Sequence, residues 1–132
     1  MERGWHTYWQ NAGDSGLPTT LTLKLPEGLK AGPIQWPAPR ALPVGPLVNY
    51  GYQGEVLLLS DIATVPDFLS GKTVTLSARA DWLVCKEICI PEGADLSLSL
   101  PVIADAAQVA RDPRWSDAIA KTRASLPRPA DD

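Results

Sequence analysis

The 132-residue sequence contains no run of about 18 apolar residues, and its first residues lack the apolar stretch of a signal peptide. It therefore predicts no membrane-spanning helix and no secretion signal. A long basic run is also missing, since 12 lysines and arginines stand against 15 aspartates and glutamates. Nucleic-acid binding depends on such a basic surface, so we set this class of function aside. Residues 126–132 are typical of a linker, so we expect a piece of a longer protein whose targeting and membrane segments lie elsewhere.

Charged residues make up 20% of the chain and hydrophobic residues 45%, which is ordinary for a globular domain and unlike a disordered tail or a coiled coil. Its 13 prolines and 10 glycines are spread along the chain, so they shorten every regular element and disfavour a helical bundle. Short strands joined by turns are therefore expected, within one domain.

Three segments alternate between apolar and polar residues with a period of two, which is typical of half-buried antiparallel strands. They are residues 20–25, 73–82 and 95–100. The second segment carries Trp82 on its apolar face, so we predict that Trp82 lies in the core.

Other segments are predicted with less regular patterns. Residues 5–9 form a strand whose two faces carry different side chains. These are Trp5, Thr7 and Trp9 on one face, and His6 and Tyr8 on the other. The apolar run 55–59 is predicted as a further strand, and the proline-rich segment 28–46 as a long loop with a short strand at 34–36.

A short helix is predicted near the C-terminus, because Asp112 can cap it and Pro113 suits its first position. Many short strands without helix–strand alternation predict an all-β protein. We expect an immunoglobulin-like antiparallel β-sandwich with a short C-terminal helix, rather than a thioredoxin-like α/β fold. Residues 1–102 would form the sandwich, and residues 103–132 the helix and a linker.

The two cysteines, Cys85 and Cys89, are the most informative residues of the sequence, with three residues between them. In an extended strand their Cα atoms would lie about 13 Å apart, beyond the roughly 7 Å that a disulfide allows, so the chain must turn between them. A bond across so short a loop stabilises the fold by only about 2 kcal/mol. A redox-active pair is therefore favoured over a structural one.

Two alternatives stay open for the pair: a structural clip that fixes a hairpin, and a metal site. With His6 the cysteines offer three ligands, whereas structural zinc needs four. Cu(I) needs fewer ligands, so an immunoglobulin-like copper-handling or binding module remains the alternative function.

Thiol–disulfide exchange needs a thiolate that attacks a disulfide sulfur and a second thiol that resolves the mixed disulfide, and it needs no cofactor and no metal. Lys86 favours a thiolate and Glu87 opposes it, so their effects nearly cancel. Access should therefore control reactivity more than charge does. His6 could act as a general base, but a single histidine beside aromatic residues is more often a packing residue.

The sequence resembles the N-terminal periplasmic domain of the thiol:disulfide interchange protein DsbD family, including its suppressor-of-copper-sensitivity branch. The resemblance covers about residues 4–102. It is carried by residues 5–9 with 13–18, by residues 50–52 and by residues 81–91.

This resemblance implies a protein-disulfide reductase domain in the periplasm, part of an inner-membrane protein. Its cysteine pair would accept electrons from a thioredoxin-like domain of the same membrane protein. It would then reduce disulfide isomerases and thioredoxin-like proteins of cytochrome c maturation. Cys89 matches the cysteine that forms the mixed disulfide, and Cys85 matches the resolving cysteine. The family's best-known member has more than three residues between its cysteines, and in this respect the sequence departs toward the suppressor-of-copper-sensitivity branch.

The resemblance also implies a short aromatic loop that shields the cysteine pair. Tyr50, within residues 49–53, is the best match for this cap, and Tyr52, Tyr8 and His6 match positions that line the site. The alternative is that Tyr50 and Tyr52 are ordinary aromatic residues of a sandwich.

Overall fold

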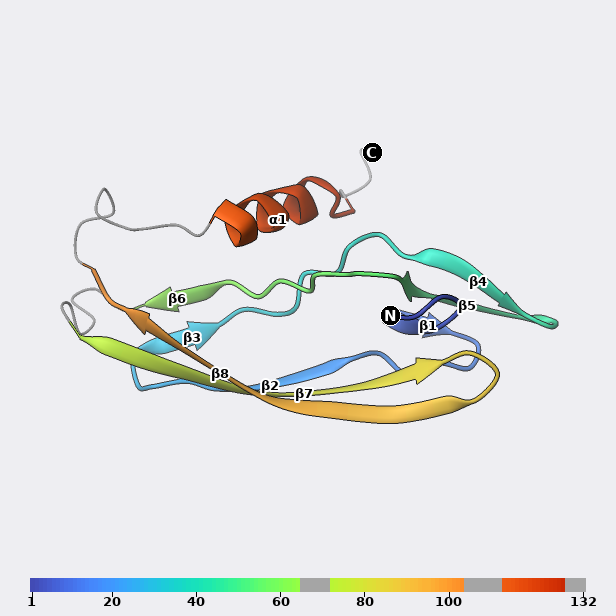
Figure 1. The fold of residues 1–132 in the computed structure, drawn as a ribbon, viewed down its shortest axis with the longest axis horizontal. Helices are drawn as coiled ribbons and strands as arrows, with labels where there is room; N and C mark the ends of the chain where they lie inside the picture. The colour runs from blue at the N-terminus through green and yellow to red at the C-terminus, as the bar shows by residue number, and fades with distance from the viewer. Residues whose placement is uncertain (65–71, 104–112, 128–132) are drawn as a thin grey trace.

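The computed structural model of the protein describes residues 1–64, 72–103 and 113–127 (Figure 1). Within these residues the chain forms eight strands followed by one helix. In chain order they are β1 (His6–Gly13), β2 (Thr20–Lys24), β3 (Leu29–Ala31), β4 (Arg40–Val44), β5 (Leu47–Gln53), β6 (Ile62–Thr64), β7 (Thr73–Cys85), β8 (Cys89–Pro101) and α1 (Pro113–Ala124).

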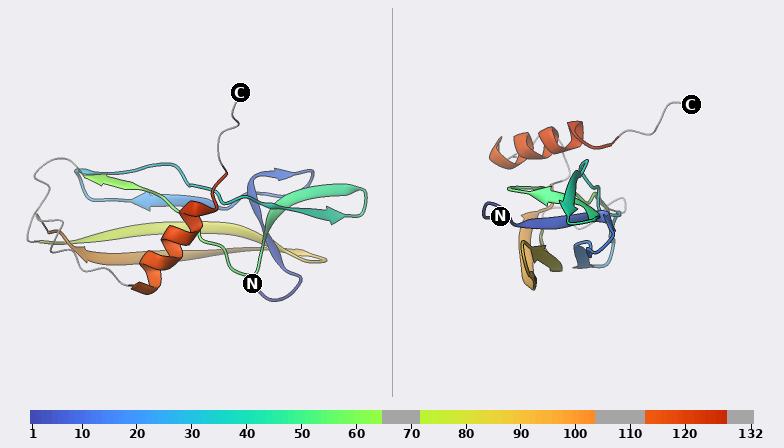
Figure 2. Two further views of the ribbon diagram at one scale, coloured as in Figure 1. Left: turned by 90° about the horizontal axis from the view of Figure 1, so that it is seen from above. Right: turned by 90° about the vertical axis from the view of Figure 1, so that its right-hand side faces the viewer.

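The strands lie in two layers, as predicted for a sandwich. Figure 1 shows β2, β7 and β8 below and the β4–β5 and β3–β6 pairs above, with α1 outside β6, and Figure 2 shows the same layers from the end. Strand β1 joins the layers, because the hydrogen-bonded order is β2-β7-β1-β5-β4, with β8 on the other edge of β7. All the strand pairs described are antiparallel.

The β4–β5 hairpin shows how local sequence sets the strands. Val44 pairs with Leu47, so Gly45 and Pro46 form a two-residue loop. Such tight hairpin loops need a positive φ to match the twist of the strands, and Gly45 supplies a φ of 61°. Pro43 lies within β4, where the missing N–H is tolerated because β4 is an edge strand.

Four of the predicted strands are confirmed, namely residues 5–9, 20–25, 73–82 and 95–100. The strand predicted at 55–59 is wrong, because only Leu59 forms a bridge, with Gln35. The short strand predicted at 34–36 is wrong as well. The strands of this region are β3 and β4, which lie on either side of residues 33–39, where three prolines remove the N–H donors that a ladder needs.

The core is small and lies mainly between the layers. Its buried apolar residues are Tyr8, Ala12, Leu42, Tyr52, Leu59, Val74, Val84 and Cys85. Trp82, predicted in the core, is only half-buried. The apolar residues of β8 are exposed instead of half-buried, namely Leu96, Leu98 and Leu100. Among the described strands β8 pairs only with β7, at the edge of its layer, and these side chains find no cover in the described part of the chain.

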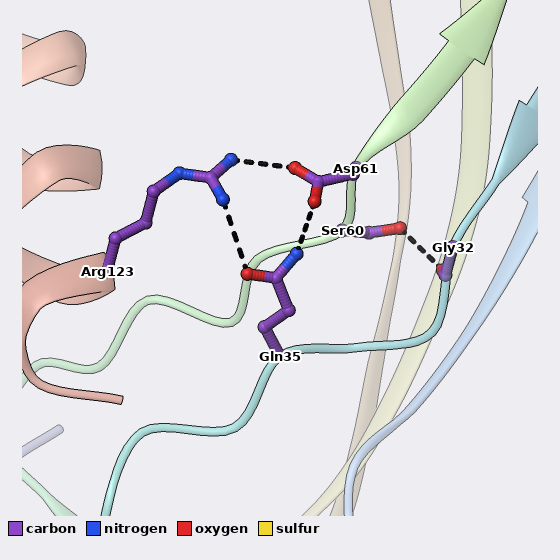
Figure 3. Close-up of polar contacts among 5 residues, drawn as sticks. All are labelled: Gly32, Gln35, Ser60, Asp61 and Arg123. Carbon is purple, nitrogen blue, oxygen red and sulfur yellow. Dashed lines mark hydrogen bonds and ion pairs between the residues drawn. The ribbon is translucent and has the colours of Figure 1, made fainter. Parts of the chain in front are cut away.

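Helix α1 is fastened to the β3–β6 layer by one polar cluster, shown in Figure 3. Arg123 forms an ion pair with Asp61 at 2.7 Å and donates to the Gln35 side chain at 3.4 Å. Gln35 in turn donates to Asp61 at 2.7 Å. These hydrogen bonds, first that from Arg123, lower the pKa of Asp61. Because these side chains are largely exposed to solvent, they contribute little stability and mainly orient the helix.

The helix begins at Pro113, as predicted, while the predicted cap Asp112 lies outside the described residues. None of the helices described is long and apolar enough to cross a membrane. The division of the chain at residue 102 stays a prediction.

Candidate redox-active disulfide

The two cysteines are joined in a disulfide at the tip of the β7–β8 hairpin. Cys85 ends β7 and Cys89 begins β8, and they are directly paired, with their Cα atoms 4.1 Å apart. The three residues between them form the turn, closed by a bond from the Lys86 N–H to the Ile88 carbonyl at 3.0 Å. The predicted turn is therefore confirmed.

The two sides of the disulfide differ in exposure. Cys85 is only 2% exposed, whereas Cys89 is exposed to solvent beside Ile88, which is 65% exposed. Cys89 is therefore the accessible half of the disulfide, and Cys85 is the enclosed half. Because exchange requires in-line attack, an attack at the Cys89 sulfur makes Cys85 the leaving group. The exposed isoleucine offers a partner an apolar contact next to the reactive sulfur.

His6 and Tyr8 lie beside Cys85 on the buried side of the disulfide, and we call these two side chains the inner wall of the site. His6 pairs directly with Cys85 across β1 and β7, so their side chains lie on the same face of the sheet. Tyr8, two residues further along β1, shares this face and packs with Cys85 and Ala12 in one buried cluster. His6 Nε2 lies 3.2 Å from the Tyr8 hydroxyl, and the two rings meet edge to face. The sequence prediction that these two residues share a face is confirmed.

Burial keeps this wall uncharged. It lowers the pKa of His6 and raises the pKa of Tyr8, so both side chains are neutral near pH 7. A neutral imidazole and a neutral phenol can still donate hydrogen bonds. The disulfide is thus backed by polar groups without a fixed charge.

The loop after β1 presses against Tyr8. A Cβ atom at Gly16 would overlap the Tyr8 ring, so only glycine fits there. The loop is held by Asn49, a 1% exposed residue of β5 that accepts a bond from the Ser15 N–H at 2.9 Å. In addition, Asp14 accepts a bond from the Val48 N–H at 2.7 Å. Sequence reasoning missed the role of Asn49; its only signal was a polar residue inside an otherwise apolar and aromatic strand.

Tyr50 and Tyr52 do not join His6 and Tyr8 at the disulfide. Their segment is strand β5 and not a loop, and Gly51 is the residue that pairs with Tyr8. Since alternate residues of a strand face opposite sides, both tyrosines point away from the face that carries Cys85. Tyr50, 37% exposed, lies beside Gly13. This position gives a shielding role for Tyr50 no support, and the cap stays a prediction.

Tyr52 is buried, and its hydroxyl donates to the Pro37 carbonyl at 2.7 Å. Burial raises the pKa of Tyr52 far above its usual value. The contact ties β5 to the proline-rich segment before β4, so in this conformation Tyr52 serves the sandwich rather than the disulfide.

In the copper alternative His6 would join the two cysteines as a ligand. His6 does lie opposite Cys85, but its Nε2 is bonded to the Tyr8 hydroxyl. In the part of the chain that the structure describes, no three His, Cys, Asp or Glu side chains gather as a metal site would require. The arrangement therefore gives the copper-handling alternative no specific support.

Two shallow hollows lie near the hairpin tip. The larger, of about 310 Å³, includes Val84, Ile90 and Glu92 in its lining, and the smaller, of about 290 Å³, is lined by residues of the turn. Trp5 lines both hollows. Because Val84 and Ile90 alternate with the cysteines along the two strands, the larger hollow lies on the sheet face opposite to the disulfide.

The chain is thus a two-layered β-sandwich with a disulfide across a hairpin tip, of which one cysteine is exposed and the other buried. This arrangement is suited to thiol–disulfide exchange. Residues 1–101 match the family described as "Thiol:disulfide interchange protein DsbD, N-terminal", and the chain belongs to this family. The predicted resemblance is thereby confirmed.

The fold also matches the crystal structure of the N-terminal periplasmic domain of ScsB from Proteus mirabilis. The TM-score is 0.66 at 22% sequence identity, and the match covers 96% of this chain and 45% of that one. This similarity supports the predicted immunoglobulin-like sandwich. The chain thus spans less than half the length of the solved domain. No curated protein is significantly similar to it.

Proposed function

We propose that the chain is a periplasmic protein-disulfide reductase domain that accepts electrons from a thioredoxin-like domain and passes them to disulfides of other proteins. Family membership supports thiol–disulfide interchange in general. The observation that carries the proposal is the unequal exposure of the two cysteines, because it supports a separate role for each of them. The periplasmic origin of the ScsB domain supports the compartment.

The electron-accepting half begins at Cys89. A thiolate of the donor attacks the Cys89 sulfur and forms a mixed disulfide, while the bond to Cys85 breaks and its electron pair stays on the Cys85 sulfur. A second thiolate of the donor then attacks the donor's own sulfur and releases Cys89 as a thiolate. Two electrons have moved, leaving both cysteines reduced and a disulfide in the donor.

The electron-donating half runs in the opposite direction. The Cys89 thiolate attacks a disulfide of the acceptor, and one acceptor sulfur leaves as a thiolate. Cys85 then attacks the Cys89 sulfur, re-forms the internal disulfide and releases the second acceptor sulfur. We infer that thioredoxin-like proteins and disulfide isomerases are the acceptors, and that the donor domain belongs to the same membrane protein.

Trapping the mixed disulfide tests this assignment. The Cys85→Ser variant, mixed with a thioredoxin-like protein whose resolving cysteine is replaced by serine and whose remaining cysteine is activated as a mixed disulfide with thionitrobenzoate, should form a covalent complex through Cys89 that neither protein can resolve. The matched Cys89→Ser variant should form little or none, because its remaining thiol is buried. Equal trapping by both variants, or trapping by neither, would contradict the roles assigned to the two cysteines.

A further inference from the structure

Attack at Cys89 leaves a negative charge on the Cys85 sulfur, in an apolar part of the site. Cys85 is 2% exposed and packs against Tyr8 and Ala12, with Leu83 beside this cluster. A charge among apolar side chains is costly unless a hydrogen bond compensates it. The wall behind Cys85 therefore determines how readily the disulfide opens.

The described groups that face Cys85 offer few donors. Next to the two cysteines on this face, β7 contributes Leu83 and β8 contributes Pro91. Further along lies the exposed ion pair of Arg79 with Asp81, and β5 contributes Gln53, which pairs with His6. The charged residues Lys86 and Glu87 lie in the exposed turn. His6 and Tyr8 of β1 are thus the titratable groups beside the buried sulfur.

We propose that the Tyr8 hydroxyl, positioned by His6, donates a hydrogen bond to the Cys85 sulfur as the disulfide opens. Tyr8 packs in the same cluster as Cys85, and His6 lies directly across the strand pair from Cys85. When the His6 proton is on Nε2, the imidazole donates to the Tyr8 oxygen over the 3.2 Å contact. This leaves the phenolic hydrogen free to turn to the sulfur.

The step balances without a further reactant, and it rests on the proposed attack at Cys89. The donor thiolate forms a bond to the Cys89 sulfur, and the electron pair of the broken bond stays on Cys85. Tyr8 keeps its proton, because burial makes the phenol a weaker acid. The proton that finally converts the Cys85 thiolate to a thiol comes from water.

The test compares the acidity of Cys85 in reduced variants. In a Cys89→Ser background Cys85 is the sole thiol, and the ¹³Cβ chemical shift of Cys85 reports its ionisation as pH is raised. Adding Tyr8→Phe removes the hydroxyl but keeps the ring that fills the core. The pH of half-ionisation should then rise by about one to two units, since a hydrogen bond to a charged group is lost.

If Tyr8 has only a structural role, the pH of half-ionisation of Cys85 should fall instead, because looser packing admits water and stabilises the thiolate. A fall or no change would therefore overturn the proposal. Tyr52→Phe is the matched control: it also removes a buried tyrosine hydroxyl, one bonded to the Pro37 carbonyl, and should leave Cys85 unaffected. An equal rise in this control would equally overturn the proposal.

Reduction kinetics provide the second readout. In the disulfide form of the chain, Tyr8→Phe should slow reduction by dithiothreitol about three- to tenfold, because the rate follows the stability of the leaving thiolate. His6→Phe should slow it similarly, and His6→Gln less, since an amide can still donate to Tyr8. An unchanged rate in Tyr8→Phe would refute the role of the hydroxyl.

Failure of the proposed function is distinguishable from failure of this inference. If no mixed disulfide forms at Cys89 with any thioredoxin-like protein, the reductase proposal fails. The Cys85 titration would still show whether Tyr8→Phe raises or lowers the pH of half-ionisation. If complexes form at Cys89 and Tyr8→Phe leaves both readouts unchanged, only the hydrogen-bond proposal fails.

Discussion

Reduction of the disulfide should weaken the fold only slightly. The bond closes a loop of five residues, from Cys85 to Cys89, and so short a loop removes little entropy from the unfolded chain, about 2 kcal/mol. The native hairpin retains its alignment without the bond, because β7 and β8 pair continuously from Thr73 with Pro101 to Cys85 with Cys89. For a domain of this size the loss corresponds to a fall in Tm of about 5–10 °C.

Thermal unfolding followed by circular dichroism, with and without a phosphine reductant, measures this loss. The Cys85→Ser/Cys89→Ser double variant controls for effects of the reductant itself and should melt at the same temperature in both conditions. A reduced chain that is unfolded at 25 °C would refute the reasoning. The bond would then be a structural clip, and a protein that unfolds on reduction cannot carry electrons between partners.

Three further predictions concern His6, Gly16 and Tyr50. Burial lowers the pKa of His6 below its ordinary 6.5, so the unfolded chain binds a proton that the native site excludes; stability should fall as pH drops below 6.5 in urea unfolding, and His6→Gln should flatten that dependence. Gly16→Ala should destabilise the domain by about 1–3 kcal/mol, because its methyl group displaces the Tyr8 ring; unchanged stability would mean that the ring moves freely. Tyr50→Ala should leave the rate of reduction by dithiothreitol unchanged, whereas the cap predicted from sequence requires faster reduction.

The sequence predicts those strands whose own residues alternate between apolar and polar, whatever their neighbours are. The alternation in residues 20–25 and 73–82 arises because one face of each strand packs inward. This period of two is the same whichever strands lie beside it. The different environments of His6 and Trp5 follow from the same alternation. The turn at Cys85 and Cys89 follows from chain geometry alone if the two sulfurs are to be joined.

Other features depend on neighbours that a sequence does not show. The apolar run 55–59 resembles a strand, yet only Leu59 finds a partner, because pairing depends on which edge lies beside it. Tyr50 and Tyr8 belong to adjacent strands, and whether they share a face is decided by the β1–β5 register, which a bulge in β1 interrupts. The exposure of Leu96 likewise depends on what covers this face of β8, which an alternating pattern does not show.

The unbroken pairing of β7 with β8 has a consequence for how long partners stay attached. In the proposed mixed disulfide at Cys89, the strand ladder keeps Cys85 directly opposite, with the two Cα atoms 4.1 Å apart in the disulfide form. Ring closure is then an intramolecular reaction with a high effective concentration. If the proposed cycle holds, covalent intermediates are brief, and the domain meets one partner after another without a separate release step.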